Sequence, residues 1–147
     1  MSEVKKPHLP IGYWLKRADE VLTKRINEAQ RANGLSRTEW QILNVLSEVG
    51  SATDEQLEAP LRPFADITSL RELISGLQQR GLVSGKGTAD DRYALTTHGQ
   101  QTHEAALALQ KEVRRQAMKD ISEEDYATTV HVLQRIVENL SGEGAAH

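Results

Sequence analysis

The apolar residues near the N-terminus recur at steps of three and four, which is the spacing of one helical face. This pattern predicts a first helix from about Ile11 to Ala32, ended by Asn33-Gly34. A second helix is expected to open at Ser36, because Glu39 stands three residues later and the pair has the form of a capping box. Gly50 is expected to end this second helix.

Two further helices are predicted before the pattern changes. Thr53 and Gln56 form a second capping box, and the short helix that they begin is expected to be interrupted by Pro60 and Pro63. Asp66 or a neighbour caps a fourth helix that reaches about Arg80. The apolar stripe of this helix is made of Ile67, Leu70, Leu73, Ile74 and Leu77.

After Gly81 the period of the pattern shortens. Leu82-Val83 is predicted as a short strand, residues 85–91 as a polar turn and Arg92–Leu95 as the return strand of a β-hairpin. A fifth helix, capped by Thr96 or Thr97, is expected to reach about Asp120.

Ser122 is expected to cap a last helix whose apolar residues alternate at steps of four and three, which is typical of a helix that packs on another helix. These residues are Tyr126, Val130, Leu133, Val137 and Leu140. The predicted fold class is therefore mainly α with a small two-stranded β-hairpin wing. It is a winged helix-turn-helix over residues 35–96, flanked by N- and C-terminal dimerisation helices in residues 1–34 and 97–147. The flanking helices carry more apolar surface than the middle unit can cover, so we expect them to pair with a second copy.

Composition removes several classes of function. The chain has 147 residues and no cysteine, which excludes disulfides, thiol nucleophiles and cysteine-based zinc sites. No apolar run approaches the roughly 18 residues of a membrane span, and residues 1–10 hold no signal-peptide core, so we expect a cytoplasmic protein. The five histidines lack metal-site spacing and are expected at surface or capping positions. Neither a phosphate-binding loop nor a nucleophile–base set is present, so we expect no enzyme, metal or cofactor.

The fourth helix is the candidate recognition helix, because a helix-turn-helix places its second helix in the major groove of DNA. Its outer face offers small hydroxyls for phosphate contacts and one arginine long enough to reach guanine edges. These residues are Thr68, Ser69, Arg71 and Ser75. The same residues also fit the solvated face of an ordinary helix.

The hairpin turn carries Lys86, Asp90 and Arg92. A wing of this kind can insert an arginine into the minor groove, and an acidic neighbour can orient the guanidinium. A surface turn with scattered charges is the alternative. The net charge is -3, and residues 62–92 hold only one more basic than acidic residue, so DNA binding is expected to be modest and salt-dependent.

Three of the six aromatic residues lie on the first two predicted helices. Tyr13, Trp14 and Trp40 fit either the lining of a pocket for a flat hydrophobic effector or ordinary core packing.

Three segments together resemble the MarR (multiple antibiotic resistance regulator) family. They are Leu-Ser-Arg-Thr-Glu-Trp-Gln-Ile-Leu at residues 35–43, Gln-Arg-Gly-Leu-Val at residues 79–83, and Asp-Asp-Arg at residues 90–92 followed by Leu-Thr-Thr-His-Gly at residues 95–99. The resemblance implies an obligate homodimer that represses transcription from a pseudo-palindromic operator. It also implies a small anionic or aromatic effector, bound between the dimer helices and the DNA-reading units.

Carried over by position, the resemblance implies that Thr53 lies near phosphate and that the recognition helix faces DNA with Thr68, Ser69 and Arg71. It also implies that Lys86 and Arg92 act in the wing, and that Asp90 orients Arg92. Two features depart from the family pattern, namely the proline-rich turn at residues 60–65 and the short return strand. With the weak local charge, they leave open a winged-helix protein–protein adaptor that has lost DNA binding.

Overall fold

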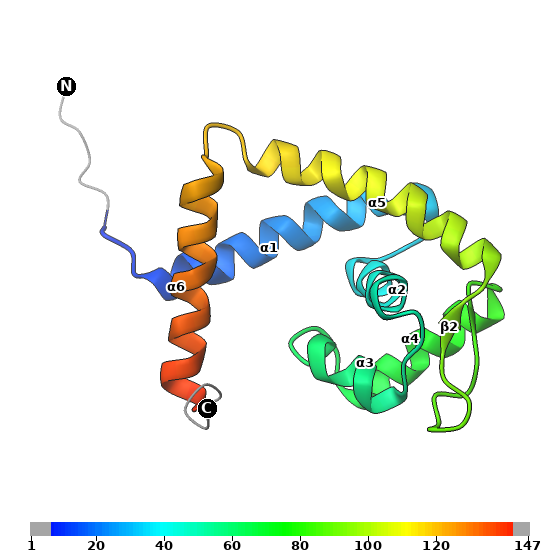
Figure 1. Cartoon of the computed structure of the whole chain (residues 1–147). Coiled ribbons are helices and arrows are strands. Elements are labelled where there is room, and N and C mark those ends of the chain that lie inside the picture. Colours follow the sequence, from blue (N-terminus) through cyan, green and yellow to red (C-terminus); the bar gives the residue numbers. More distant parts are fainter. Residues whose placement is uncertain (1–6, 143–147) are drawn as a thin grey trace. The chain divides into compact units, whose positions relative to one another are not determined.

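The order of elements follows the sequence pattern closely. The structure is a computed structural model that describes residues 7–142 of the chain (Figure 1). Its elements are α1 (Ile11–Gln30), a turn of 3-10 helix (Arg31–Asn33), α2 (Arg37–Val49), α3 (Asp54–Leu61), α4 (Ile67–Gln79), β1 (Val83–Ser84), β2 (Ala94–Leu95), α5 (Thr97–Ala117) and α6 (Glu123–Ser141). The predicted fold class, mainly helical with a two-stranded hairpin, is confirmed.

The predicted helix starts are confirmed by their capping contacts. The Ser36 hydroxyl accepts from the Glu39 N–H at 3.2 Å, while the Ser36 N–H donates to the Glu39 carboxylate at 2.9 Å. The Asp66 carboxylate accepts from the Ser69 N–H at 2.8 Å. These contacts satisfy backbone donors that a helix start otherwise leaves without partners.

Two predicted helix ends are wrong. Pro60 does not interrupt α3, which continues through it to Leu61. A proline in the last turn removes a single backbone hydrogen bond, and the burial of Leu61 holds that turn against the core. The helix α5 ends at Ala117 and not near Asp120, which adopts a left-handed conformation with φ 61°.

The core is centred on α2, which contacts α1, α3, α4 and β2. Ile42 and Leu43 of α2 are fully buried, as are Leu70 and Leu77 of α4. Burial of side chains of this size is the main source of folding free energy. The apolar stripe predicted for the fourth helix therefore faces this core and leaves the opposite face of α4 in solvent.

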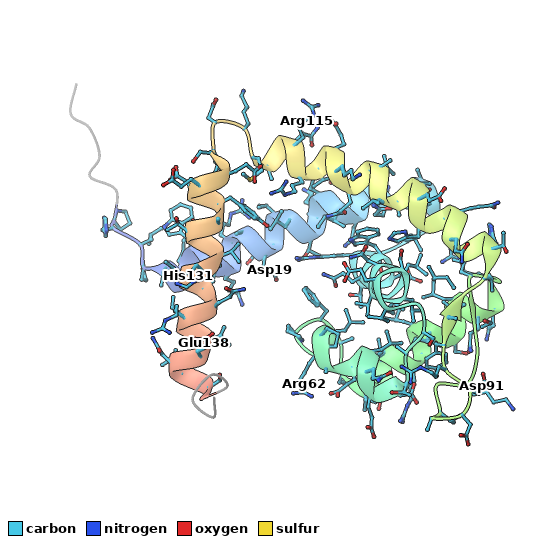
Figure 2. The ribbon with its side chains drawn as sticks, in the orientation of Figure 1. Asp19, Arg62, Asp91, Arg115, His131 and Glu138 are labelled. Carbon is cyan, nitrogen blue, oxygen red and sulfur yellow. The ribbon has the colours of Figure 1, made fainter. Side chains whose placement is uncertain are left out.

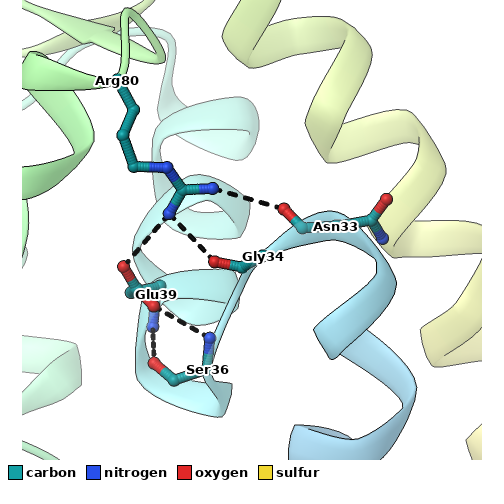
Figure 3. A network of polar contacts seen from close by, with 5 residues as sticks. All are labelled: Asn33, Gly34, Ser36, Glu39 and Arg80. Atoms are coloured by element: carbon teal, nitrogen blue, oxygen red, sulfur yellow. Dashed lines mark hydrogen bonds and ion pairs between the residues drawn. The ribbon is translucent and has the colours of Figure 1, made fainter.

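Polar side chains fix the elements around this core. Arg80, at the end of α4, donates to the carbonyl oxygens of Gly34 (3.0 Å) and Asn33 (3.3 Å) and forms an ion pair with Glu39 (3.6 Å; Figure 3). Gln30 is fully buried, and its amide donates to the Ala106 carbonyl at 2.8 Å, which joins α1 to α5.

Arg37 anchors the start of α2 to two other segments. Its guanidinium donates to Asp19 at 2.8 Å and to Thr23 at 2.7 Å, both on α1. It also lies 5.0 Å above the ring of Phe64, in the turn that precedes α4. This contact connects the proline-rich turn, which leads into α4, to the start of α2.

The chain divides into two compact units, one reaching to Val113 and the other beginning at Arg114. Within the second unit the Arg114 guanidinium donates to Glu123 at 3.2 Å and lies 4.8 Å from the ring of Tyr126. No residue of α6 is buried. Among residues 7–142, no helix is both long enough and apolar enough to cross a membrane.

Candidate nucleic-acid interface

The outward face of α4 carries the four residues that the sequence predicts for DNA contact on this helix. Thr68, Ser69, Arg71 and Ser75 are all exposed, while Leu70 and Ile74 between them are buried. Hydrogen bonding from the backbone of Ser69 lowers the pKa of the Asp66 carboxyl, which keeps this cap charged at the start of the helix. The face is thus presented by a helix whose first turn is fixed.

The first turn of α3 lies against α4. The Thr53 hydroxyl caps α3 by accepting from the Gln56 N–H at 3.2 Å, so it occupies a helix start, as predicted. Asp54 forms an ion pair with Arg71, with 3.4 Å between Oδ2 and Nε. Arg71 therefore has a partner within the chain, and no local sequence pattern indicates this pairing.

The wing is more firmly attached than a simple hairpin. β1 and β2 pair in antiparallel fashion, with Val83 opposite Leu95 and Ser84 opposite Ala94. Ala52 and Tyr93 add a bridge, exchanging backbone hydrogen bonds of 3.0 and 2.9 Å. The segment between α2 and α3 thus pairs with the return strand of the wing.

Lys86, Asp90 and Asp91 are exposed residues of the wing turn. The turn is closed by Thr88, whose N–H donates to the Asp91 carbonyl at 2.9 Å. Figure 2 shows Asp91 at the far end of the wing.

Arg92 does not follow the predicted arrangement. Its guanidinium donates to the Ser51 hydroxyl at 3.0 Å, to the Ser51 carbonyl at 3.3 Å, and to the Gln56 side chain. Within the described residues it is not ion-paired with Asp90, so the prediction that Asp90 orients Arg92 is wrong for the isolated chain. The reason is the bridge formed by Ala52, which brings Ser51 beside the strand residue that precedes Tyr93.

Tyr93, the residue after Arg92, is buried. Burial raises the pKa of Tyr93 to about 12, and hydrogen bonding and charge from Asp54 act in the same direction. Gly87 has φ 74°, and a Cβ there would lie 2.3 Å from the Tyr93 ring. The wing therefore needs glycine at this position, both for the backbone conformation and for the approach of the ring.

The three aromatic residues predicted to line an effector pocket fall into two groups. Tyr13 and Trp14 are exposed on α1 and contact each other edge to face, with ring centroids 4.9 Å apart. Trp40 is buried in the core and stacks on His103, with centroids 5.4 Å apart. A joint lining is not formed within one chain, because Trp40 faces inward from α2.

His103 corrects the expectation that every histidine lies at a surface or capping position, since it is only 7% exposed. Its ring lies 3.0 Å from Oδ1 of Asn44, and it follows the same α5 face as Ala106 and Val113. That spacing was the sequence signal for its burial. His103 also borders a cavity of about 410 Å³. The cavity is lined by Leu46, Ser47, Gly50, Leu95, Gln100, His103, Glu104 and Leu107.

The burial of His103 predicts an acid-sensitive fold. Burial lowers the pKa of His103 from its ordinary 6.5, while the charges of Glu104 and Glu48 oppose the shift. Below pH 6.5 the unfolded chain therefore binds a proton that the folded chain does not, and stability falls as the pH drops. One proton contributes a slope of at most about 1.4 kcal/mol per pH unit. Thermal melts between pH 7.5 and 5.5 test this, and His103→Gln is expected to reduce the slope. An equal slope in both proteins contradicts the prediction.

No family model matches the sequence, and no curated protein matches it. Solved structures do match the fold. A probable transcriptional regulator from Pseudomonas aeruginosa is 27% identical, with a TM-score of 0.74 over 86% of this chain and 96% of its own. A MarR-family transcriptional regulator from Rhodococcus sp. RHA1 is 21% identical, with a TM-score of 0.78 over 86% and 92%. CouR from Rhodococcus jostii RHA1, bound to p-coumaroyl-CoA, is 22% identical, with a TM-score of 0.77 over 86% and 91%.

Proposed function

We propose that this chain, which has the winged-helix fold of MarR-family transcriptional regulators, is a sequence-specific DNA-binding regulator. The observation that carries the proposal is the exposed polar face of α4, with Arg71 at its centre and the wing beside it. We propose that Thr68, Ser69 and Ser75 bind phosphates, and that Arg71 reads base edges in the major groove. Thr53 adds a phosphate contact, and Lys86 and Arg92 act in the minor groove.

We further propose that the regulator is a homodimer. Residues 1–34 and 97–147 form the dimerisation region, and residues 35–96 form the DNA-reading unit. The support is α6, where Tyr126, Val137 and Leu140 are 41%, 50% and 85% exposed within one chain. Two DNA-reading units related by a two-fold axis fit a pseudo-palindromic operator whose half-sites lie about 34 Å apart.

The last part of the proposal is repression that a small aromatic or anionic effector relieves. The cavity beside His103 touches the ring that stacks on Trp40, so an occupant of this cavity acts on the core of the DNA-reading unit. The effector shifts the spacing of the two DNA-reading units only to the extent that it binds the two arrangements with different affinity.

Effector binding is expected to be visible in tryptophan fluorescence. A planar carboxylate or phenol should quench the emission and release DNA at the same concentrations. A fluorescence titration with a ligand panel, repeated on Trp40→Phe and Trp14→Phe, identifies the responding ring. If neither emission nor DNA affinity changes across the panel, the effector part of the proposal is wrong.

DNA binding is tested by selecting bound sequences from random DNA and then measuring affinity at two salt concentrations. Arg71→Ala should weaken binding to the selected site by about 5- to 150-fold, the worth of one bidentate arginine–guanine pair. A plot of the logarithm of DNA affinity against the logarithm of salt concentration should become less steep by about one unit in Arg92→Ala.

The matched control is Lys24→Ala, which removes one exposed positive charge from α1, outside the proposed interface. It should leave sequence preference unchanged. If selection enriches no sequence, the protein–protein adaptor is the better assignment. If a sequence is enriched but neither arginine variant weakens binding, the assigned DNA-reading face is wrong.

A further inference from the structure

Asp54 occupies a position where three parts of the DNA-reading unit meet. It is the first residue of α3, its carboxylate pairs with Arg71 of α4, and its N–H donates to the carbonyl of Gly87 in the wing at 3.1 Å. The recognition helix and the wing are therefore connected through one residue of a third element.

The carboxylate of Asp54 is largely shielded from solvent. Its side chain is only 22% exposed, and its charge helps to raise the pKa of the nearby Tyr93. A Cβ at Gly87 would lie 2.9 Å from Oδ1 of Asp54, which shows how closely the wing packs on this group. The partner of Arg71 is thus a closely packed group at 22% exposure, whereas the Arg71 side chain is 59% exposed.

Exposed ion pairs contribute little to stability, with typical values of about 0–1 kcal/mol, so stabilising the fold is a weak reason for this contact. A carboxylate beside a DNA-binding surface also repels phosphate. What the pair supplies is orientation, because a guanidinium already held at Nε loses less conformational freedom when its remaining N–H groups bind a base.

We propose that Asp54 is a positioning residue for sequence reading: it orients Arg71 and sets the recognition helix against the wing. The inference rests on the proposed DNA-binding function. Asp54 lowers the affinity for all DNA through its charge and raises the discrimination between sequences by aligning Arg71.

The chain offers a matched control in Glu55, the next residue of the same helical turn. Glu55 is exposed and carries the same charge near the same helix start, but it is not the residue paired with Arg71. Asp54→Asn and Glu55→Gln therefore remove the same charge, and only the first removes the ion pair.

The experiment measures, for the full chain, the ratio of affinities for the selected operator and for unrelated DNA of equal length. Both variants should bind unrelated DNA more tightly than the parent protein. Only Asp54→Asn should lower the ratio, by about fivefold or more. The reason is that a misaligned Arg71 loses much of the preference for the correct base that one arginine–base pair provides. In an Arg71→Ala background, Asp54→Asn should change the ratio no further.

Two results overturn the inference: an equal ratio for Asp54→Asn and Glu55→Gln, or an effect of Asp54→Asn that persists without Arg71. If Asp54→Asn does not fold, Asp54→Ser replaces it, because serine likewise removes the charge and the ion pair with Arg71. This variant should lower the ratio where Glu55→Gln does not, and an unchanged ratio overturns the inference. Failure of the proposed function is recognised separately, when the parent protein prefers no sequence, and the inference then fails with it.

Discussion

Replacing Gly99 by alanine is expected to destabilise the fold by about 3 kcal/mol, the upper range for overpacking a filled site. Gly99 lies in the first turn of α5, and a Cβ there would be 2.0 Å from the carbonyl oxygen of Leu82. The opposing atom belongs to the backbone, so it cannot rotate away. The first turn of α5 must therefore move away from the segment that leads into β1.

The same substitution is expected to loosen the wing. The Thr96 hydroxyl donates to the Gly81 carbonyl at 2.6 Å and accepts from the Gly99 N–H at 2.9 Å, and the Thr96 N–H donates to Leu82 at 3.1 Å. A shift of α5 distorts these three hydrogen bonds of Thr96 at once. We therefore expect Gly99→Ala to weaken DNA binding even under conditions where the protein is still folded.

Gly76→Ala is the control for the effect of alanine at a helical glycine. Gly76 lies within α4, and an added Cβ would meet no atom within 4 Å apart from its chain neighbours and the backbone of its own helix. Alanine should therefore stabilise the protein by up to about 1 kcal/mol, since glycine is the poorer helix former. Denaturant unfolding of both variants gives the two values. Stabilities for Gly99→Ala and the parent that differ by less than 0.5 kcal/mol, roughly the size of an ordinary surface substitution, contradict the packing argument.

Local features of the fold were predictable because their causes lie within a few residues. The capping boxes at Ser36 and Thr53 and the cap at Asp66 follow from a side chain and a backbone N–H three positions apart. The apolar stripe of α4 follows from helix periodicity in the same way, and its exposed outer face follows from the stripe. Gly99 was visible as part of a family motif, but its reason, the close approach of Leu82, is a contact between distant segments.

The site was less predictable because the positions of its arginines depend on contacts with residues that are far away in the sequence. The sequence favoured the neighbour Asp90 as the partner of Arg92, whereas Ser51 lies 41 positions away and is brought near by the Ala52–Tyr93 bridge. An isolated bridge of one residue pair leaves no alternating pattern from which it can be predicted. The pairing of Asp54 with Arg71 likewise depends on how α3 packs against α4.

Two buried polar residues were also not predictable, because their burial depends on contacts between distant segments. Gln30 and His103 are polar by type, so a hydrophobic pattern assigns them to the surface. Both are buried because each has a hydrogen-bond partner on another helix, Ala106 and Asn44 respectively. Recognition of such residues requires knowledge of which helices face each other, which a single sequence supplies only through weak spacing signals.

Replacing Val137 by aspartate is expected to convert the proposed homodimer into single chains and to lower operator affinity by about 10²- to 10⁴-fold, the gain that linking two binding units provides. Val137 lies on the apolar seam of α6 and is 50% exposed within one chain. A charge there costs the single chain little, whereas in a helix–helix interface it is an unpaired buried charge. Sedimentation at micromolar concentration and DNA titration measure the two effects.

Thr128→Asp is the matched control, because residue 128 lies nine positions before residue 137, about half a turn around the helix, and is exposed. It introduces the same charge on the opposite face of α6 and should leave both the assembly and the operator affinity unchanged. If Val137→Asp and Thr128→Asp sediment alike and bind the operator alike, the apolar seam of α6 is not the dimer contact. A parent protein that sediments as a single chain contradicts the homodimer itself, and the high exposure of the seam then requires a different partner.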